Sequence, residues 1–195
     1  MVLPSIERPK KLPVVLGRNE VRRLLRAPKL LKHRLVLAML YGCGLRNFEL
    51  CNLQLKDLDL ERMMLHIRQG KGRKDRYVPL CAMQVRGLRK YISAERPVTW
   101  CFNGNDSKGD PVALSTTGVQ WIVREARKHS GIQKEVTTHS LRHSYATHLL
   151  EMGLDIISVK DLLGHADIQT TLTYLHVAQL GRQRPFSPLE RLYNK

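Results

Sequence analysis

Residues 138–149 read THSLRHSYATHL, and the rest of the chain is interpreted around them. Large apolar side chains recur every four positions from Leu141 to Leu149, which predicts a helix with one buried stripe. His139 and Arg142 lie three residues apart, so they share an adjacent face of that helix. The stretch therefore predicts a buried helix that presents an imidazole and a guanidinium side by side.

Two more side chains follow this helix in a fixed order. A helix is predicted over residues 155–163, and its closing Gly164 places His165 directly beyond the helix end. Tyr174 comes nine residues later, on the last predicted helix. A tyrosine on a helix is most often part of a core. Here it follows an arginine and two histidines, an order that suits phosphate chemistry with the phenol as nucleophile.

A second arginine lies earlier in the chain, in a segment predicted to be helical over residues 45–53. Arg46 and Glu49 are three residues apart and lie on one face of that helix. Taken alone, this spacing favours a structural salt bridge.

A small sheet is predicted in the middle of the chain. Residues 63–68 and 76–80 read as two strands joined by a basic turn, in which Lys71 stands between two glycines. A lysine in such a turn is usually just exposed. We expect residues 91–101 to add a helix end and a third edge strand, and residues 103–111 to form a polar loop.

Further helices complete the predicted architecture. The first begins near Arg18, a strongly apolar core helix covers residues 30–41, and another runs from an N-cap at Ser115 to Ser130. Thr170 is predicted to cap the last helix. The pattern predicts a mostly helical α+β domain of ordinary size.

The net charge of +16, with an isoelectric point near 10.1, indicates that the chain binds a polyanion. Nucleic acid is the favoured partner. A basic ribosome-like or heparin-binding surface is the alternative, and a membrane is the weaker competitor because no apolar run is long enough to span a bilayer. Phosphate contacts would position DNA without reading its sequence. The side chains proposed to contact DNA are Lys10, Lys11, Arg22, Arg26, Arg73 and Lys74.

The four cysteines include no C-x-x-C pair, so they are interpreted as core thiols of a reduced, cytosolic protein. His139 and His143 have the i, i+4 spacing of zinc proteases. The glutamate that should follow the first histidine is replaced by Ser140, so no metal site is predicted.

Over residues 12–177 the chain resembles the tyrosine recombinase (phage integrase) family, most closely the Xer-type and integron-integrase branches. Several short patterns in a fixed order carry the resemblance. They are Gly44-Leu45-Arg46-x-x-Glu49-Leu50, Gly70-Lys71-Gly72, His139-x-x-Arg142, Gly164-His165 and Tyr174. The resemblance implies the tyrosine recombinase catalytic-domain fold with a small antiparallel β-sheet.

The resemblance also implies an activity, namely site-specific recombination of DNA through a 3'-phosphotyrosyl intermediate. Tyr174 would attack the phosphate, two arginines would bind it, and Lys71 would protonate the leaving 5'-oxygen. No metal, ATP or other cofactor is expected. The implied catalytic residues are Arg46, Lys71, His139, Arg142, His165 and Tyr174, with Glu49 as a supporting residue.

We expect residues 1–17 to form a basic extended arm, 18–180 the catalytic domain, and 181–195 a tail with a candidate trans-docking helix. The family's N-terminal core-binding domain is expected to be absent. The expected partner is double-stranded DNA, bound by a homo-oligomer of two to four copies that is monomeric when free. The expected location is the bacterial cytoplasm, at the nucleoid, in the service of a mobile element. A type IB topoisomerase and a non-catalytic DNA-binding protein of the same fold are the alternatives.

Overall fold

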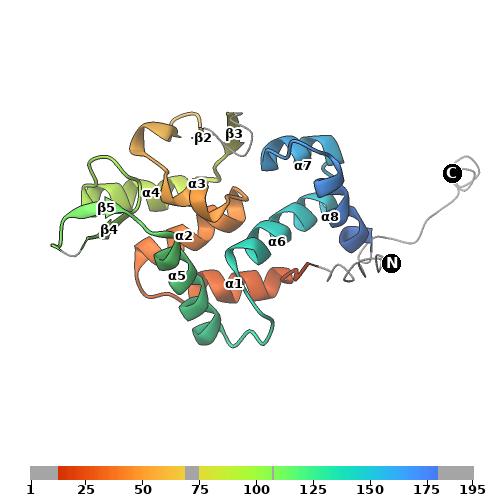
Figure 1. The fold of residues 1–195 in the computed structure, drawn as a ribbon, viewed down its shortest axis with the longest axis horizontal. Helices are drawn as coiled ribbons and strands as arrows, with labels where there is room; N and C mark the ends of the chain where they lie inside the picture. The colour runs from red at the N-terminus through yellow and green to blue at the C-terminus, as the bar shows by residue number, and fades with distance from the viewer. Residues whose placement is uncertain (1–12, 69–74, 107, 180–195) are drawn as a thin grey trace, which may run out of the picture.

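The structure is a computed structural model that describes residues 13–68, 75–106 and 108–179. Eight α-helices and five short strands lie in these ranges (Figure 1). The helices are α1 (Arg18–Arg26), α2 (Leu31–Gly42), α3 (Asn47–Cys51), α4 (Ala82–Glu95), α5 (Thr116–Ser130), α6 (Thr138–Glu151), α7 (Ile156–Leu163) and α8 (Gln169–Gln179). The strands are β1 (Leu58–Asp59), β2 (Met64–Ile67), β3 (Arg76–Pro79), β4 (Asn103–Asn105) and β5 (Pro111–Ala113).

The small antiparallel sheet has the order β1-β2-β3, with Leu65 of β2 opposite Val78 of β3. Both side chains are fully buried, because alternate residues of each strand face the core. The two strands that the sequence predicted are confirmed. The third strand is β1, so the expectation of an edge strand in residues 91–101 was wrong. That segment contributes one isolated bridge, between Trp100 and Gln54.

Two further segments differ from the sequence-based expectation. Residues 103–111 were expected to be a polar loop, but β4 and the start of β5 pair there as a hairpin. Helix α4 was expected only as a helix end, because its N-cap is Cys81 instead of Ser, Thr, Asp or Asn. The side chain of Gln84 accepts a hydrogen bond from the backbone N–H of Cys81 at 2.9 Å and supplies the missing cap. Cys81 is exposed, so it is not the core thiol that was expected, unlike the other three cysteines.

Helix starts in the second half of the chain follow their capping residues. Ser115 and Asp155 cap α5 and α7 as predicted. Thr170 was expected to cap the last helix, but α8 already begins at Gln169, whose backbone N–H donates to Asp167 Oδ1 at 3.0 Å. Thr170 therefore lies in the first turn of α8.

The buried apolar residues form two clusters that meet along α6. The larger one surrounds α2 and includes Leu141 of α6. The smaller one lies among α6, α7 and α8 and includes Tyr145, Leu163 and Tyr174. Figure 1 shows α6 between the body of the domain and the α7–α8 pair. Its polar residues are therefore presented where the two parts join.

The expected turn with Lys71, Arg73 and Lys74 falls in residues 69–74, outside the described ranges. The same holds for Lys10, Lys11 and the tail from residue 181 onward. Among the helices that the structure describes, none combines the length and hydrophobicity needed to cross a membrane.

Candidate active site

A cavity of about 290 Å³ opens where α3, α6, α7 and α8 meet. Five of the six catalytic residues predicted from the sequence line it, and the sixth, Lys71, lies outside the described residues. The sequence-predicted residues on the wall are Arg46, His139, Arg142, His165 and Tyr174, and His143, Ala166, Asp167 and Thr170 complete the lining.

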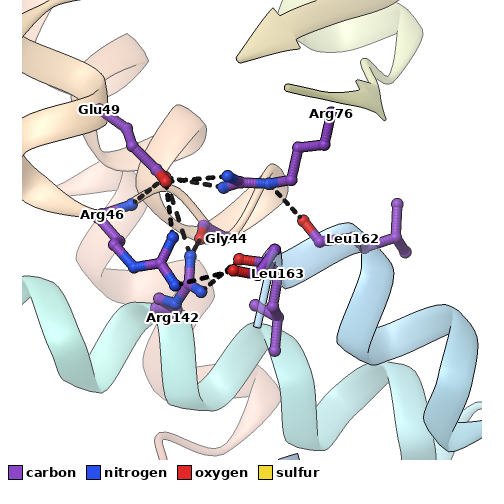
Figure 2. Close-up of polar contacts among 8 residues, drawn as sticks. Gly44, Arg46, Glu49, Arg76, Arg142, Leu162 and Leu163 are labelled. Carbon is purple, nitrogen blue, oxygen red and sulfur yellow. Dashed lines mark hydrogen bonds and ion pairs between the residues drawn. The ribbon is translucent and has the colours of Figure 1, made fainter. Parts of the chain in front are cut away.

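Glu49, on α3, is the centre of a cluster of three guanidinium groups (Figure 2). It accepts hydrogen bonds from Arg46 Nη1 at 2.7 Å and from the Arg46 backbone N–H at 2.8 Å. Arg76, the first residue of β3, donates to both carboxylate oxygens, at 2.9 and 2.7 Å. Nη1 of Arg142 lies 3.9 Å from the same carboxylate. We call Arg46, Glu49, Arg76 and Arg142 the arginine cluster.

Backbone carbonyls at the end of α7 orient these guanidinium groups. Leu163 O accepts from Arg142 Nη2 at 2.6 Å, and Leu162 O accepts from Arg76 Nε at 2.9 Å. The carbonyl of Gly164, just past the helix, accepts from Arg46 Nη2 at 3.2 Å. A helix leaves its last carbonyls unpaired and carries partial negative charge there, so this end favours cations. The end of α7 therefore holds all three arginines.

Two glycines let the backbone approach the arginine cluster. Gly44 has φ +59°, its carbonyl accepts from Arg142 Nη1 at 2.5 Å, and a Cβ there would lie 2.5 Å from the Tyr145 ring. Gly164 has φ +62°, and a Cβ there would lie 2.9 Å from Arg76 Nη1. Both positions favour glycine because their backbone is left-handed; at Gly44 the Tyr145 ring also occupies the space, and at Gly164 the Arg76 side chain would have to shift.

The pKa values of Glu49 and Arg142 keep both side chains charged at neutral pH. Burial would raise the pKa of Glu49, but hydrogen bonds and charge from Arg76, reinforced by Arg46, hold it at about 2. Burial, helped by the charge of Arg46 and opposed by Glu49, lowers the pKa of Arg142 to about 10. Three cations face one carboxylate in this cluster, which leaves a surplus of two positive charges. The cluster is therefore suited to bind an anion such as a phosphate group.

Tyr174 lies beside this cluster on α8 and is only 3% exposed. Its hydroxyl forms a hydrogen bond of 3.0 Å with Nδ1 of His143, and its ring stacks on His165 with centroids 6.1 Å apart. Burial raises the pKa of the phenol, while the charges of Arg142 and Arg46 oppose the shift. The hydroxyl is thus held protonated next to two cations.

The histidines around Tyr174 are neutral at physiological pH. Burial, followed by the charges of Arg142 and Arg46, lowers the pKa of His165 to about 3. Its Nδ1 is paired with the buried Thr171 hydroxyl at 2.9 Å. Burial, followed by the charges of His139 and Arg142, lowers the pKa of His143 to about 4. We call His143, His165, Thr171 and Tyr174 the tyrosine cluster.

The structure also locates the remaining predicted residues. His139 is exposed in the first turn of α6, with its ring centroid 6.4 Å from that of His143. Arg22 and Arg26 are exposed on α1, and their contact with DNA stays a prediction. Within the described ranges, no three His, Cys, Asp or Glu side chains gather as metal ligands would.

Sequence reasoning missed two residues of the site. Arg76 was treated as the start of a strand, although it stands two residues before the buried Val78 and so shares its inward face. His143 was considered only for its spacing from His139. That same spacing puts both histidines on the face that carries the cavity.

Comparison with known proteins gives consistent matches over most of the chain. The model of the phage integrase family matches residues 15–180. Tyrosine recombinase XerA of Thermococcus kodakarensis is 41% identical over 171 residues, which cover 87% of this chain and 60% of that protein. The chain thus spans from about three fifths to about three quarters of the length of the first curated relatives it matches.

Solved structures agree with the fold. The crystal structure of XerA recombinase superimposes with a TM-score of 0.77 at 31% identity, over 93% of this chain and 68% of that one. XerH site-specific recombinase, in a post-cleavage complex with palindromic difH substrate, gives a TM-score of 0.73 at 26% identity, over 93% of this chain and 53% of that one. The predicted α+β fold, mostly helical with a small antiparallel sheet, is confirmed.

Proposed function

The chain belongs to the phage integrase family of tyrosine recombinases, and from that premise we propose that it breaks and rejoins double-stranded DNA at specific sites. The observation that carries the proposal is the position of Tyr174, a buried phenol in one cavity with Arg46 and Arg142. A nucleophile beside surplus positive charge is what attack on a phosphodiester requires.

In the proposed reaction the Tyr174 oxygen attacks the phosphorus atom and displaces the 5'-oxygen, leaving the enzyme joined to the 3'-phosphate. Charge grows on the equatorial oxygens in the transition state, so fixed cations stabilise it. Arg46 and Arg142 fill this role because a guanidinium is always charged and holds oxygens in a forked geometry. His139 and His165 donate further hydrogen bonds. Lys71 protonates the leaving oxygen, as in the family whose Gly-Lys-Gly pattern it matches.

Rejoining uses the same groups in reverse. The phosphotyrosyl bond keeps the energy of the broken phosphodiester, so a 5'-hydroxyl can attack it without ATP. The arginines supply the charge that a metal supplies elsewhere. Cleavage should therefore continue in the presence of a metal chelator. If the chelator abolished cleavage and added magnesium or zinc restored it, the histidines would instead be metal ligands.

The partner proposed for this surface is double-stranded DNA, since a relative of the same fold is described in complex with its DNA substrate. Arg22 and Arg26 contribute exposed positive charge for phosphate contacts. Exchange between two duplexes needs four active sites, so the proposed assembly on DNA runs from a dimer on one duplex to a tetramer on two. The bacterial nucleoid is the proposed location. The segment 181–195 is proposed to dock on a neighbouring copy. Deleting residues 186–195 should then weaken assembly more than single-site binding.

Capture of the covalent intermediate tests the function and finds the target. The protein is mixed with a library of duplexes, denatured, and the DNA that stays attached is sequenced. A recombinase should retain one family of sequences, and Tyr174→Phe should bind DNA equally well but retain none, because it loses one hydroxyl and no charge.

The same capture separates the rivals. Attachment to many unrelated sequences, with relaxation of a supercoiled plasmid, would favour a type IB topoisomerase. A gel shift without any covalent product would favour a DNA-binding protein that does not cut.

A further inference from the structure

The hydroxyl of Tyr174 is hydrogen-bonded to His143, a residue outside the family patterns in this sequence. The distance from the phenol oxygen to Nδ1 is 3.0 Å, and the two rings lie 5.3 Å apart between centroids. His139, which the resemblance assigns to the site, is exposed one helical turn earlier. The imidazole in contact with the reacting oxygen is therefore that of His143.

We propose that His143 is the general base that takes the phenol proton when Tyr174 attacks the phosphate. The inference rests on the proposed recombinase function and deepens it. A phenol is a weak nucleophile while it keeps its proton, and a base within hydrogen-bond reach removes that proton as the new bond forms.

Geometry fixes the tautomer that this role needs. The phenol has one proton to donate, so Nδ1 of His143 must be the acceptor and its ring proton must sit on Nε2. The charged and titratable groups around the ring are His139 and Arg142 on α6, Arg46 before α3, His165 and Asp167 between α7 and α8, and Tyr174 on α8.

These surroundings keep His143 in the form that accepts a proton. Burial, followed by electrostatic interaction with His139 and Arg142, holds the pKa of His143 at about 4, so the free protein carries a neutral imidazole at this position. A DNA phosphate bound at Arg46 and Arg142 brings negative charge that offsets theirs. The basicity of His143 should rise on substrate binding, at the step where the base acts.

The proton and bond changes balance without any further reagent. The bond from the Tyr174 oxygen to phosphorus forms as the bond from phosphorus to the 5'-oxygen breaks. The phenol proton goes to Nδ1 of His143, and the leaving oxygen takes a proton from the acid assigned to Lys71. On rejoining, the 5'-hydroxyl gives its proton back to the amine assigned to Lys71 as it attacks phosphorus, and His143 returns its own proton to the departing Tyr174 oxygen.

His143→Asn tests the role, because the asparagine amide oxygen can accept the phenol hydrogen bond at the place of Nδ1 but cannot take the proton. Adduct formation is measured in a single turnover on the duplex recovered by capture, across a range of pH. We expect a loss of about a hundredfold at neutral pH, with a rate that climbs about tenfold per pH unit while that of the unchanged chain levels off. His129→Asn, on the exposed end of α5, is the matched control and should behave as the unchanged chain.

Three outcomes would contradict the inference. His143→Asn with the rate and pH profile of the unchanged chain would leave His143 as a group that only orients Tyr174. A ¹⁵N spectrum of the unchanged protein with the ring proton on Nδ1 would exclude the base without any variant. If the unchanged chain formed no adduct on any duplex, the proposed function would fall and the inference with it.

Discussion

The two halves of the cavity are held together in different ways. In the arginine cluster, full charges meet in bidentate contacts, and backbone carbonyls at the end of α7 fix every guanidinium. In the tyrosine cluster, neutral side chains are linked by single hydrogen bonds of 2.9 to 3.0 Å and by ring stacking. One half is built to keep its charge at any physiological pH, and the other is built to move a proton.

This difference separates binding from bond breaking. Changes in the arginine cluster should alter anion affinity, transition-state charge and stability together, because the same contacts serve all three. Changes in the tyrosine cluster should alter proton transfer and leave DNA affinity almost untouched. Each variant below tests whether the two halves separate in this way.

The largest effect is expected from Arg142→Ala, which removes two hydrogen bonds to backbone carbonyls and one cation from the site. Adduct formation should fall about a thousandfold, the scale on which loss of one preorganised transition-state donor acts. Replacing the scissile 5'-oxygen of DNA by sulfur should not restore it, because the better leaving group does not replace the lost charge.

Lys71→Ala is the matched variant for the same pair of substrates. If Lys71 is the general acid, sulfur should restore most of its rate, because a thiolate leaves without a proton. Equal impairment of Lys71→Ala on both substrates would make Lys71 an electrostatic contact, and rescue of Arg142→Ala by sulfur would make Arg142 part of the proton path.

Glu49→Ala should reduce the free energy of unfolding by about 3 kcal/mol or more, because it leaves buried guanidinium groups without their carboxylate. The folded pKa of about 2 lies below the ordinary 4.5, so this carboxylate stabilises the fold above pH 4.5 and the effect is lost as pH falls toward 2. Chemical denaturation of Glu49→Gln across that range should show a flatter pH dependence than the unchanged chain.

Glu20→Gln is the control for that measurement. Glu20 pairs with the half-exposed Lys134 at 2.7 Å, and such surface pairs contribute less than about 1 kcal/mol. Equal losses at Glu20 and Glu49 would mean that the arginine cluster is no more than an ordinary ion pair.

A smaller loss is expected from Gly164→Ala, at the residue that joins the two halves. The left-handed backbone and the approach of Arg76 to a new Cβ should together cost about 2 kcal/mol in a thermal or chemical unfolding experiment. Gly131→Ala places the same change at φ +68° with no atom within 4 Å, and should cost about 1 kcal/mol. Equal losses of unfolding free energy in Gly164→Ala and Gly131→Ala would show that the Arg76 side chain can move away from a new Cβ without cost.

The smallest effect concerns the salt dependence of DNA binding. Arg46→Ala should lower the slope of log affinity against log salt by about one, since each phosphate contact releases roughly 0.9 counterions. Tyr174→Phe should leave the slope unchanged, because it removes no charge. If the slope is unchanged in Arg46→Ala, Arg46 does not contact a DNA phosphate and serves only in the structural salt bridge with Glu49.

The arginine and histidine patterns were enough to predict much of this site. Arg46, Arg142 and Tyr174 were assigned from short motifs. The starts of α5 and α7 were predicted from the capping residues Ser115 and Asp155. Local signals act over a few residues, so they also located β2 and β3. The start of helix α4 was not predicted, because Gln84, a residue inside the helix, supplies the capping hydrogen bond.

Contacts made by distant segments could not be predicted in this way. The bond between Arg76 and Glu49 joins residues 27 positions apart, and that between His143 and Tyr174 joins residues 31 positions apart. The first depends on how β3 lies against α3, and the second on how α8 packs against α6, which no short window of sequence contains. The alternation of inward- and outward-facing residues along β3 was the one sequence signal that could have placed Arg76 in the site.

The burial of Tyr174 has a consequence for how the proposed recombinase meets DNA that is not its target. With 3% of its surface exposed, the phenol is shielded, while cations outside the cavity remain free to meet any backbone that passes. Binding of DNA and cleavage of DNA are thereby separated, because DNA that is bound weakly contacts the exposed cations and not the nucleophile Tyr174. The protein can therefore contact a DNA backbone without exposing the hydroxyl of Tyr174 to it.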